Sequence, residues 1–340
     1  MFDPAAPENW RGTLATQPLA QLVSEDGRGR RVVVTGASGF VGSHACRALA
    51  ATGWQVLALV RNAGKAAERL GHMPVDIRVG DLLDPAYVRS SIDGASAVVH
   101  LAAVAIERDG DTYKSVNVGT TRAIIDAALA AGVARFVYMS QNGADSASRL
   151  PFLKSKGIAQ DLVTESTLQW TVLRPSVIFG PEDEFINVIA RLVRLTPFIL
   201  PLPSRGNARF QPVAVDDVAT VITRALADDD TVGHLYPLGG AAELSLREIA
   251  ETVLVAMDAH RAILGLPTAA LRPFVAALWH LVPRPPVTTG LLDTLALDNT
   301  VPLNTITSTF GVSPTPFGPD ALRYLRRITV SDALRSLFRD

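Results

Sequence analysis

The feature that most constrains this chain is a glycine-spaced turn, Thr35-Gly-Ala-Ser-Gly-Phe-Val-Gly42, which lies between an apolar run and a helical pattern. Residues 32–34 are all valine, which is typical of a central strand in a parallel sheet because both faces of such a strand are buried. Residues 43–51 are rich in small side chains and are followed by Gly53, a common helix terminator. The sequence therefore predicts a strand, a tight turn and a helix in direct succession.

Each glycine of the turn has a physical role. Gly36 permits backbone angles that other residues avoid, Gly39 lets a pyrophosphate approach the backbone, and Gly42 lets the helix pack on the strand. Free N–H groups and the helix dipole attract phosphate at such a helix N-terminus. We expect a dinucleotide to contact the whole turn, namely Gly36, Ala37, Ser38, Gly39, Phe40, Val41 and Gly42. A turn without a ligand is the alternative, and we favour it less because the next strand follows at βαβ spacing.

Strands and helices alternate through the first half of the chain. The sequence favours strands over residues 55–60, 76–79, 97–102, 135–140 and 170–174, and a helix over 120–131. This alternation predicts an α/β fold, a doubly wound parallel sheet of the Rossmann type. After Gly180 prolines become frequent, and helices are expected over residues 247–257, 267–281 and 332–338.

These patterns predict three regions. Residues 1–29 form an N-terminal extension, and residues 30–180 plus 207–230 form the dinucleotide-binding domain. Residues 181–206 plus 231–340 form a smaller, mostly helical C-terminal substrate or lid domain.

Composition excludes several classes of function. The formal net charge is −1 and the basic residues are scattered, whereas nucleic-acid binding needs a clustered basic surface. Cys46 is the only cysteine, so no intrachain disulfide is possible, and we interpret it as a core residue. The six histidines lack paired metal-ligand spacing, so we expect no metal site.

No apolar stretch is long enough to span a membrane, and we expect a cytoplasmic protein that can rest on the inner face of a membrane. The apolar residues 263–282 have two interpretations. A helix that covers the substrate cleft is favoured over a peripheral membrane helix.

Side chains at the ends of the second and third strands bear on the choice of cofactor. An acidic residue after the second strand selects NAD, whereas Arg61 offers charge to a 2′-phosphate. We therefore favour NADP(H) over NAD(H), with a solvated surface arginine as the alternative. Asp81, followed by Leu82, either meets the adenine or caps the next turn, and both interpretations stay open.

Small residues follow the fourth strand. Leu101, Ala102 and Ala103 would let a dinucleotide lie close to the chain. We interpret His100 as a packing residue rather than a proton donor. Asn117 is positioned to bridge backbone groups beneath the site.

Together these motifs resemble the short-chain dehydrogenase/reductase superfamily of the extended or atypical kind, over about residues 31 to 325. Further stretches resemble the atypical branch that contains the NADPH-binding accessory subunit of respiratory complex I and its bacterial relatives. These stretches are Arg135-Phe-Val-Tyr-Met-Ser140, Leu173-Arg-Pro-Ser-Val-Ile-Phe-Gly-Pro181, Phe210-Gln-Pro-Val-Ala-Val-Asp-Asp-Val218, Tyr236-Pro-Leu-Gly-Gly240 and Leu297-Asp-Asn299.

The resemblance implies a catalytic pair, Tyr-x-x-x-Lys, that this chain does not preserve. Lys156 matches the lysine that holds the nicotinamide ribose, but Phe152 stands where the tyrosine belongs, and the register on Lys154 places Leu150 there. The missing general acid/base step is commonly worth a factor of about 10²–10⁴ in rate. Ser140 matches the family's serine, and it either orders water and the nicotinamide or merely ends its strand. The resemblance places four more residues beside the carboxamide: Pro175, Ser176, Val177 and Ile178.

Two hypotheses follow, and whether the chain is an enzyme stays open. The first is an NAD(P)H-binding protein with lost or altered catalysis that has a structural or sensor role in a respiratory or quinone-related assembly. The second is an active NADP(H)-dependent reductase, dehydrogenase or epimerase that uses another donor, such as Tyr138, Ser140 or water. The expected partners are the dinucleotide, a small apolar substrate or quinone, and a membrane or protein assembly.

Overall fold

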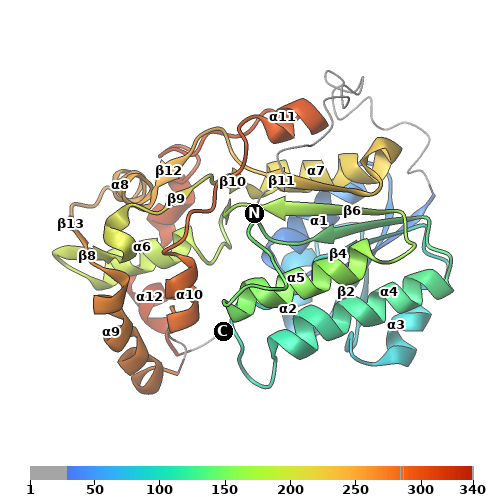
Figure 1. Ribbon diagram of the computed structural model, residues 1–340, viewed down its shortest axis with the longest axis horizontal. Helices are drawn as coiled ribbons and strands as arrows, with labels where there is room; N and C mark the ends of the chain where they lie inside the picture. The colour runs from blue at the N-terminus through green and yellow to red at the C-terminus, as the bar shows by residue number, and fades with distance from the viewer. Residues whose placement is uncertain (1–28, 284, 286, 339–340) are drawn as a thin grey trace.

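The structure is a computed structural model that describes residues 29–283, 285 and 287–338. Apart from Gly29, the expected N-terminal extension lies outside the described residues. Figure 1 shows a large sheet covered by helices next to a smaller part built from helices and short strands.

The large sheet is parallel throughout and has seven strands in the order β11-β6-β5-β4-β1-β2-β3. The order reverses between β1 and β4, and α/β sheets bind their ligands at the carboxyl ends of strands at such a point. The predicted doubly wound Rossmann fold is therefore confirmed. The strands are β1 (Arg31–Thr35), β2 (Gln55–Val60), β3 (Asp76–Val79), β4 (Ala97–His100), β5 (Arg135–Met139), β6 (Trp170–Pro175) and β11 (His234–Leu238).

Helices cover both faces of this sheet because the central strands are apolar on both sides (Figure 1). Val32 and Val34 of β1 pack in one core with α1 (Phe40–Ala51), α2 (Ala63–Leu70), α7 (Val215–Ala227) and α11 (Thr305–Phe310). Val33 packs in the opposite core, with α3 (Pro85–Ile92), α4 (Thr121–Ala130) and α5 (Pro151–Thr164). A π-helical segment, Tyr113–Thr120, leads into α4.

The smaller part has a hydrophobic core of its own, which includes Ile186, Leu200, Ile249 and Leu325. Its helices are α6 (Ile186–Leu195), α8 (Leu246–Ala256), α9 (Thr268–Leu281), α10 (Thr289–Thr294) and α12 (Val330–Arg335), with short 3₁₀ turns at Pro203–Gly206 and Arg323–Arg327 and a third at Asp229–Thr231 after α7. Its strand pairs are β8 (Ile199–Leu202) with β13 (Ala262–Gly265) and β9 (Arg209–Phe210) with β12 (Leu244–Ser245). A further pair, β7 (Ile178–Phe179) with β10 (Val213–Ala214), lies where the chain passes between the parts.

Two local differences from the sequence prediction have physical reasons. The fourth strand ends at His100 rather than at residue 102, because the chain leaves the sheet to pass beside the glycine turn. β11, which follows the boundary expected at residue 230, is an edge strand of the large sheet. Pro237 argues against a strand in the sequence. The structure accommodates this proline because an edge strand forms hydrogen bonds on one side only.

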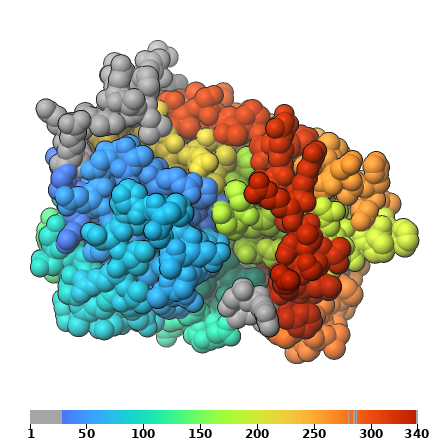
Figure 2. All heavy atoms as spheres, turned by 180° about the vertical axis from the view of Figure 1, so that it is seen from behind, coloured from blue at the N-terminus to red at the C-terminus, as the bar shows by residue number. Residues whose placement is uncertain are grey.

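Seen from behind, the C-terminal segments run between the α/β part and the rest of the smaller part (Figure 2). α11 packs on α7 and β11, so the last quarter of the chain contacts both parts. Within the described residues, no helix is long and apolar enough to cross a membrane.

Candidate dinucleotide site and adjoining pocket

The glycine turn packs closely against its surroundings at the carboxyl end of β1. Gly36 has a φ of +65°, and a Cβ there would lie 2.9 Å from the backbone nitrogen of Ala102. A Cβ on Gly42 would lie 2.1 Å from the carbonyl oxygen of Gly36. Helix α1 begins at Phe40 with no side-chain cap and no acidic residue in its first turn. The first N–H groups of α1 are therefore free to bind an anion.

A hydrogen-bonded chain of three side chains holds the ends of β1 and β4 together. The hydroxyl oxygen of Thr35 lies 2.7 Å from Nδ1 of His100, and Nε2 lies 2.9 Å from the hydroxyl oxygen of Thr121. The Thr35 hydroxyl also accepts from the N–H groups of Leu101 and Ala102. Burial lowers the pKa of His100 to about 3, so the ring is neutral and packs as the sequence predicts.

Asn117 fixes the segment after β4. Its Oδ1 accepts from the N–H of Val104 at 2.8 Å, and its Nδ2 donates to the carbonyl of Val104 at 3.0 Å. The same amide donates to the hydroxyl of Ser155 on α5 at 2.9 Å. The buried amide therefore bridges backbone groups and ties this segment to the helix that carries Lys156.

Lys156 lies buried on α5 beneath the end of β5. Its Nζ donates to the carbonyl oxygen of Met139 at 2.7 Å and lies 4.7 Å from the centroid of the Tyr138 ring. Burial lowers the pKa of Lys156 to about 7, whereas the carbonyl and the ring favour the ammonium form. The side chain is thus held in one place at the edge of the expected nicotinamide site.

Phe152 lies one helical turn before Lys156 on α5. Its ring is half-buried, and its centroid lies 6.0 Å from that of Tyr113. The Tyr113 hydroxyl donates to the carbonyl oxygen of Ala105 at 2.8 Å. Phe152 therefore places a phenyl ring where the resemblance to the superfamily implies a tyrosine hydroxyl.

The other candidate donors, Ser140 and Tyr138, are buried. The Ser140 hydroxyl donates to Oε1 of Gln160 on α5 at 2.9 Å. Tyr138 is fully buried within the sheet core, which raises the pKa of its hydroxyl. Neither side chain faces an open surface in this structure.

Arg61 follows β2 as the sequence predicts, but it is already paired. Its Nη1 and Nη2 donate to the two carboxylate oxygens of Asp111, each at 2.7 Å. Asp81 accepts from the N–H of Leu83 at 2.9 Å, which is the capping geometry that the sequence left open. Leu82 packs against the core beneath.

The stretch after β6 lies at the seam between the two parts. The Ser176 hydroxyl donates to the carbonyl oxygen of Asn299 at 2.5 Å and accepts from the N–H of Gln211 at 3.2 Å. Pro175 ends β6, Val177 packs in the core of the smaller part, and Ile178 begins β7.

Two amides at this seam were missed by the sequence analysis. Asn142 donates to Oδ1 of Asn299 at 2.8 Å, and Gln211 donates to the carbonyl of Gly240 at 2.9 Å. Gln211 and Asn299 both stand in stretches that carry the family resemblance, which was the available signal.

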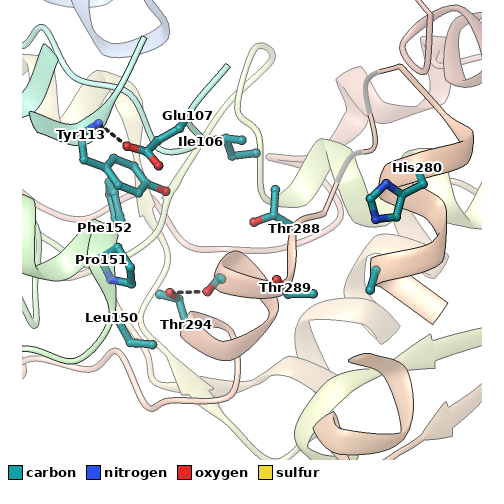
Figure 3. Close-up of a pocket in the computed structure, with 12 residues that line it drawn as sticks. Ile106, Glu107, Tyr113, Leu150, Pro151, Phe152, His280, Thr288, Thr289 and Thr294 are labelled. Carbon is teal, nitrogen blue, oxygen red and sulfur yellow. Dashed lines mark hydrogen bonds between the residues drawn. The ribbon is translucent and has the colours of Figure 1, made fainter. Parts of the chain in front are cut away.

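A cavity of about 400 Å³ lies between α5 and the helices α9 and α10 (Figure 3). Phe152 and Tyr113 face it from the α/β part, while His280 and the threonines of the α10 region face it from the other side. It is lined by Ile106, Glu107, Tyr113, Leu150, Pro151, Phe152, Ala276, His280, Thr288, Thr289, Gly290 and Thr294. None of these described lining residues is a lysine or arginine. Among the described residues, no group of histidine, cysteine and acidic side chains could hold a metal ion.

A family described as NAD(P)H-binding matches residues 36–229, which is more than half of the chain. A mitochondrial protein of Arabidopsis thaliana, NADH dehydrogenase (ubiquinone) 1 alpha subcomplex subunit 9, is 30% identical over 71% of this chain and 63% of its own length. A ceramide reductase of Caulobacter vibrioides is 32% identical over 58% of this chain and 61% of its own length. The chain thus spans less than two thirds of either relative. The 2-alkyl-3-oxoalkanoate reductase of Stenotrophomonas maltophilia is 28% identical over 87% of this chain and 98% of its own length.

Solved structures show the same fold. A dTDP-glucose 4,6-dehydratase of Streptomyces venezuelae with bound NAD has a TM-score of 0.66 and 22% identity, covering 87% of this chain and 96% of that chain. A UDP-glucose 4-epimerase of Thermus thermophilus in complex with NAD has a TM-score of 0.66 and 22% identity, covering 89% and 99%. Because the family match covers residues 36–229, the chain belongs to the NAD(P)H-binding family.

Proposed function

We propose that this chain holds a nicotinamide dinucleotide, NADP(H) in preference to NAD(H), without performing the tyrosine-dependent reaction of its superfamily. The observation that carries the proposal is a phenylalanine, Phe152, one turn before the buried Lys156, where the superfamily resemblance implies a tyrosine. A phenyl ring cannot take up or release a proton.

The residues present fit the dinucleotide. The absence of a side chain at Gly36 lets the turn pack against the backbone of Ala102, and the uncapped start of α1 offers N–H groups to the pyrophosphate. Asn117 keeps the segment after β4 in place, and a hydrogen bond to Met139 holds Lys156, to which the resemblance assigns the nicotinamide ribose. When bound, the nicotinamide supplies a hydride donor or acceptor. The proposed contacts beyond the glycine turn are Arg61, Asp81, Leu82, Leu101, Ala102, Ala103, Asn117, Lys156, Pro175, Ser176, Val177 and Ile178.

A second candidate function is an active reductase, and the cavity beside Phe152 favours it. Tyr113 offers a half-buried hydroxyl next to that cavity. Because the described lining residues include Glu107 and no lysine or arginine, they suit an anionic sugar nucleotide poorly. An uncharged carbonyl compound or quinone suits this lining better, and two relatives are named as reductases.

One experiment separates the two candidates. The full chain is loaded with NADPH, and nicotinamide absorbance is followed with a short-chain quinone, a medium-chain methyl ketone and UDP-glucose. We expect saturable NADPH binding without turnover. Turnover that is lost in Lys156→Ala or Tyr113→Phe would replace the first function with the second. The turnover of Phe152→Tyr is compared with that of a control, Phe198→Tyr. The control makes the same chemical change at a side chain that is 78% exposed.

We propose further that the role is structural or sensory, at a respiratory or quinone-linked assembly near a membrane. The Arabidopsis thaliana relative is named as an NADH dehydrogenase subunit, and α9 exposes Phe274 and Leu281. The test is flotation of the full chain with liposomes of anionic phospholipid, with and without NADPH. Co-flotation that is lost when Phe274 and Leu281 are both changed to serine supports membrane contact. No co-flotation of the unmodified chain contradicts it.

A further inference from the structure

The arginine expected to meet a 2′-phosphate has a carboxylate partner within the protein. Both Nη atoms of Arg61 donate to Asp111, one to each oxygen, at 2.7 Å. These hydrogen bonds raise the pKa of Arg61, and the negative charge of Asp81 adds to the effect. The guanidinium therefore pairs with Asp111 and is attracted more weakly by the charge of Asp81.

Backbone hydrogen bonds to Arg108 hold Asp111 in place. Arg108 and Asp111 exchange two backbone hydrogen bonds, at 2.8 and 3.2 Å, across a turn formed by Asp109 and Gly110. Both turn residues have positive φ, 54° and 88°, as a two-residue hairpin turn requires. Arg108 also donates to the carbonyl oxygen of Pro285 at 2.7 Å, which ties the turn to the C-terminal part. The carboxylate is thus presented to Arg61 by a short hairpin and not by a freely moving loop.

We propose that Asp111 is a specificity-determining residue of the dinucleotide site, because it competes with the 2′-phosphate of NADP(H) for Arg61. The inference rests on the proposed NADP(H) site and concerns how that site discriminates. An arginine binds carboxylate and phosphate through the same planar fork of N–H groups. A phosphate that approaches Arg61 must share or displace the carboxylate, and it is repelled by the charge of Asp111. NAD(H) has no such phosphate and leaves the pair intact.

The exposed fractions of Arg61 and Asp111 indicate that a 2′-phosphate can displace the carboxylate from the guanidinium. The Arg61 side chain is 66% exposed and that of Asp111 is 25% exposed. An ion pair so open to water is weak, so a dianionic phosphate can replace the carboxylate. Asp111 should therefore lower the affinity for NADP(H) without preventing its binding.

The test is a binding titration of the full chain with NADPH, NADH, 2′,5′-ADP and 5′-AMP. Asp111→Asn keeps the side-chain shape and removes the charge. We expect it to raise the affinity for NADPH and 2′,5′-ADP about two- to tenfold. The affinity for NADH and 5′-AMP should stay within about twofold, which also reports that the site is folded. Asp109→Asn is the matched control, because it removes the same charge from the same turn without touching the Arg61 pair.

The dependence on Arg61 completes the test. In an Arg61→Ala background, Asp111→Asn should change NADPH affinity no more than NADH affinity. Unchanged NADPH affinity in Asp111→Asn, an equal change for NADH, or a gain that persists without Arg61 would each overturn the inference. A wild-type chain that binds neither dinucleotide contradicts the proposed function as well. A wild-type chain that binds both, with no effect of Asp111→Asn, contradicts only the role of Asp111.

Discussion

Replacing Lys156 with methionine should remove a pH dependence from the stability of the fold. The amine is buried beneath β5, where it donates a hydrogen bond to the carbonyl oxygen of Met139. Methionine has a similar length and no charge, so Lys156→Met removes the buried ionisable group while filling nearly the same space.

The magnitude follows from the pKa of the buried amine. Burial lowers the pKa of Lys156 from 10.5 to about 7, a difference of about 3.5 pKa units. At about 1.36 kcal/mol per unit, the charged form costs the fold up to about 5 kcal/mol. Below pH 7 the amine is charged in both states, so this cost is fully present. Between pH 7 and about 10.5 the unfolded chain binds the extra proton, so stability rises with pH.

The assay is urea unfolding of the wild type and Lys156→Met at pH values from 6 to 9. The free energy of unfolding of the wild type should rise relative to that of Lys156→Met by about 1–3 kcal/mol over this range, because part of the predicted difference is reached only above pH 9. Lys154→Met is the control, since Lys154 is exposed on the same helix and should behave as wild type. Parallel curves for wild type and Lys156→Met would refute the reasoning.

Two other substitutions test how the site is supported. Asp183→Ala should lower the free energy of unfolding, measured with urea, by about 2–4 kcal/mol. The reason is that the buried Asp183 carboxylate accepts hydrogen bonds from four backbone N–H groups, those of Gly180, Phe185, Ile186 and Asn187. An unchanged free energy of unfolding would contradict that capping role. Gly157→Ala should lower the thermal unfolding midpoint by several degrees, since the added Cβ would lie 2.2 Å from the backbone of Asp145. The control Gly64→Ala should keep the midpoint of the wild type. Equal midpoints for Gly157→Ala and the wild type would contradict the tight packing of α5.

Local patterns made the nucleotide-binding half of the fold predictable. The run of valines, the spacing of Gly36, Gly39 and Gly42 and the following helix all lie within some twenty residues, and the structure has each in place. The neutral, packed state of His100 also follows from its place at the end of an apolar strand. These features depend on neighbours along the chain, which sequence patterns report well.

The remaining features depend on distant pairs. The Arg61–Asp111 pair joins residues 50 positions apart, and nothing near either residue signals the other. The same is true of the seam where Asn142 and Ser176 reach the segment around Asn299, more than 120 positions away. β11 was missed for a different reason, since Pro237 argues against a strand unless its edge position is known.

The most direct test of the account is a calorimetric titration of NADPH into the full chain and into Gly42→Ala. The added Cβ would lie 2.1 Å from the carbonyl oxygen of Gly36, so the turn cannot keep its shape, whereas Gly64→Ala meets only a flexible side chain at 3.4 Å. We predict saturable binding by the wild type and by Gly64→Ala, and a loss of at least about tenfold in affinity for Gly42→Ala. No saturable binding by the wild type, or equal affinity of Gly42→Ala, would contradict the account.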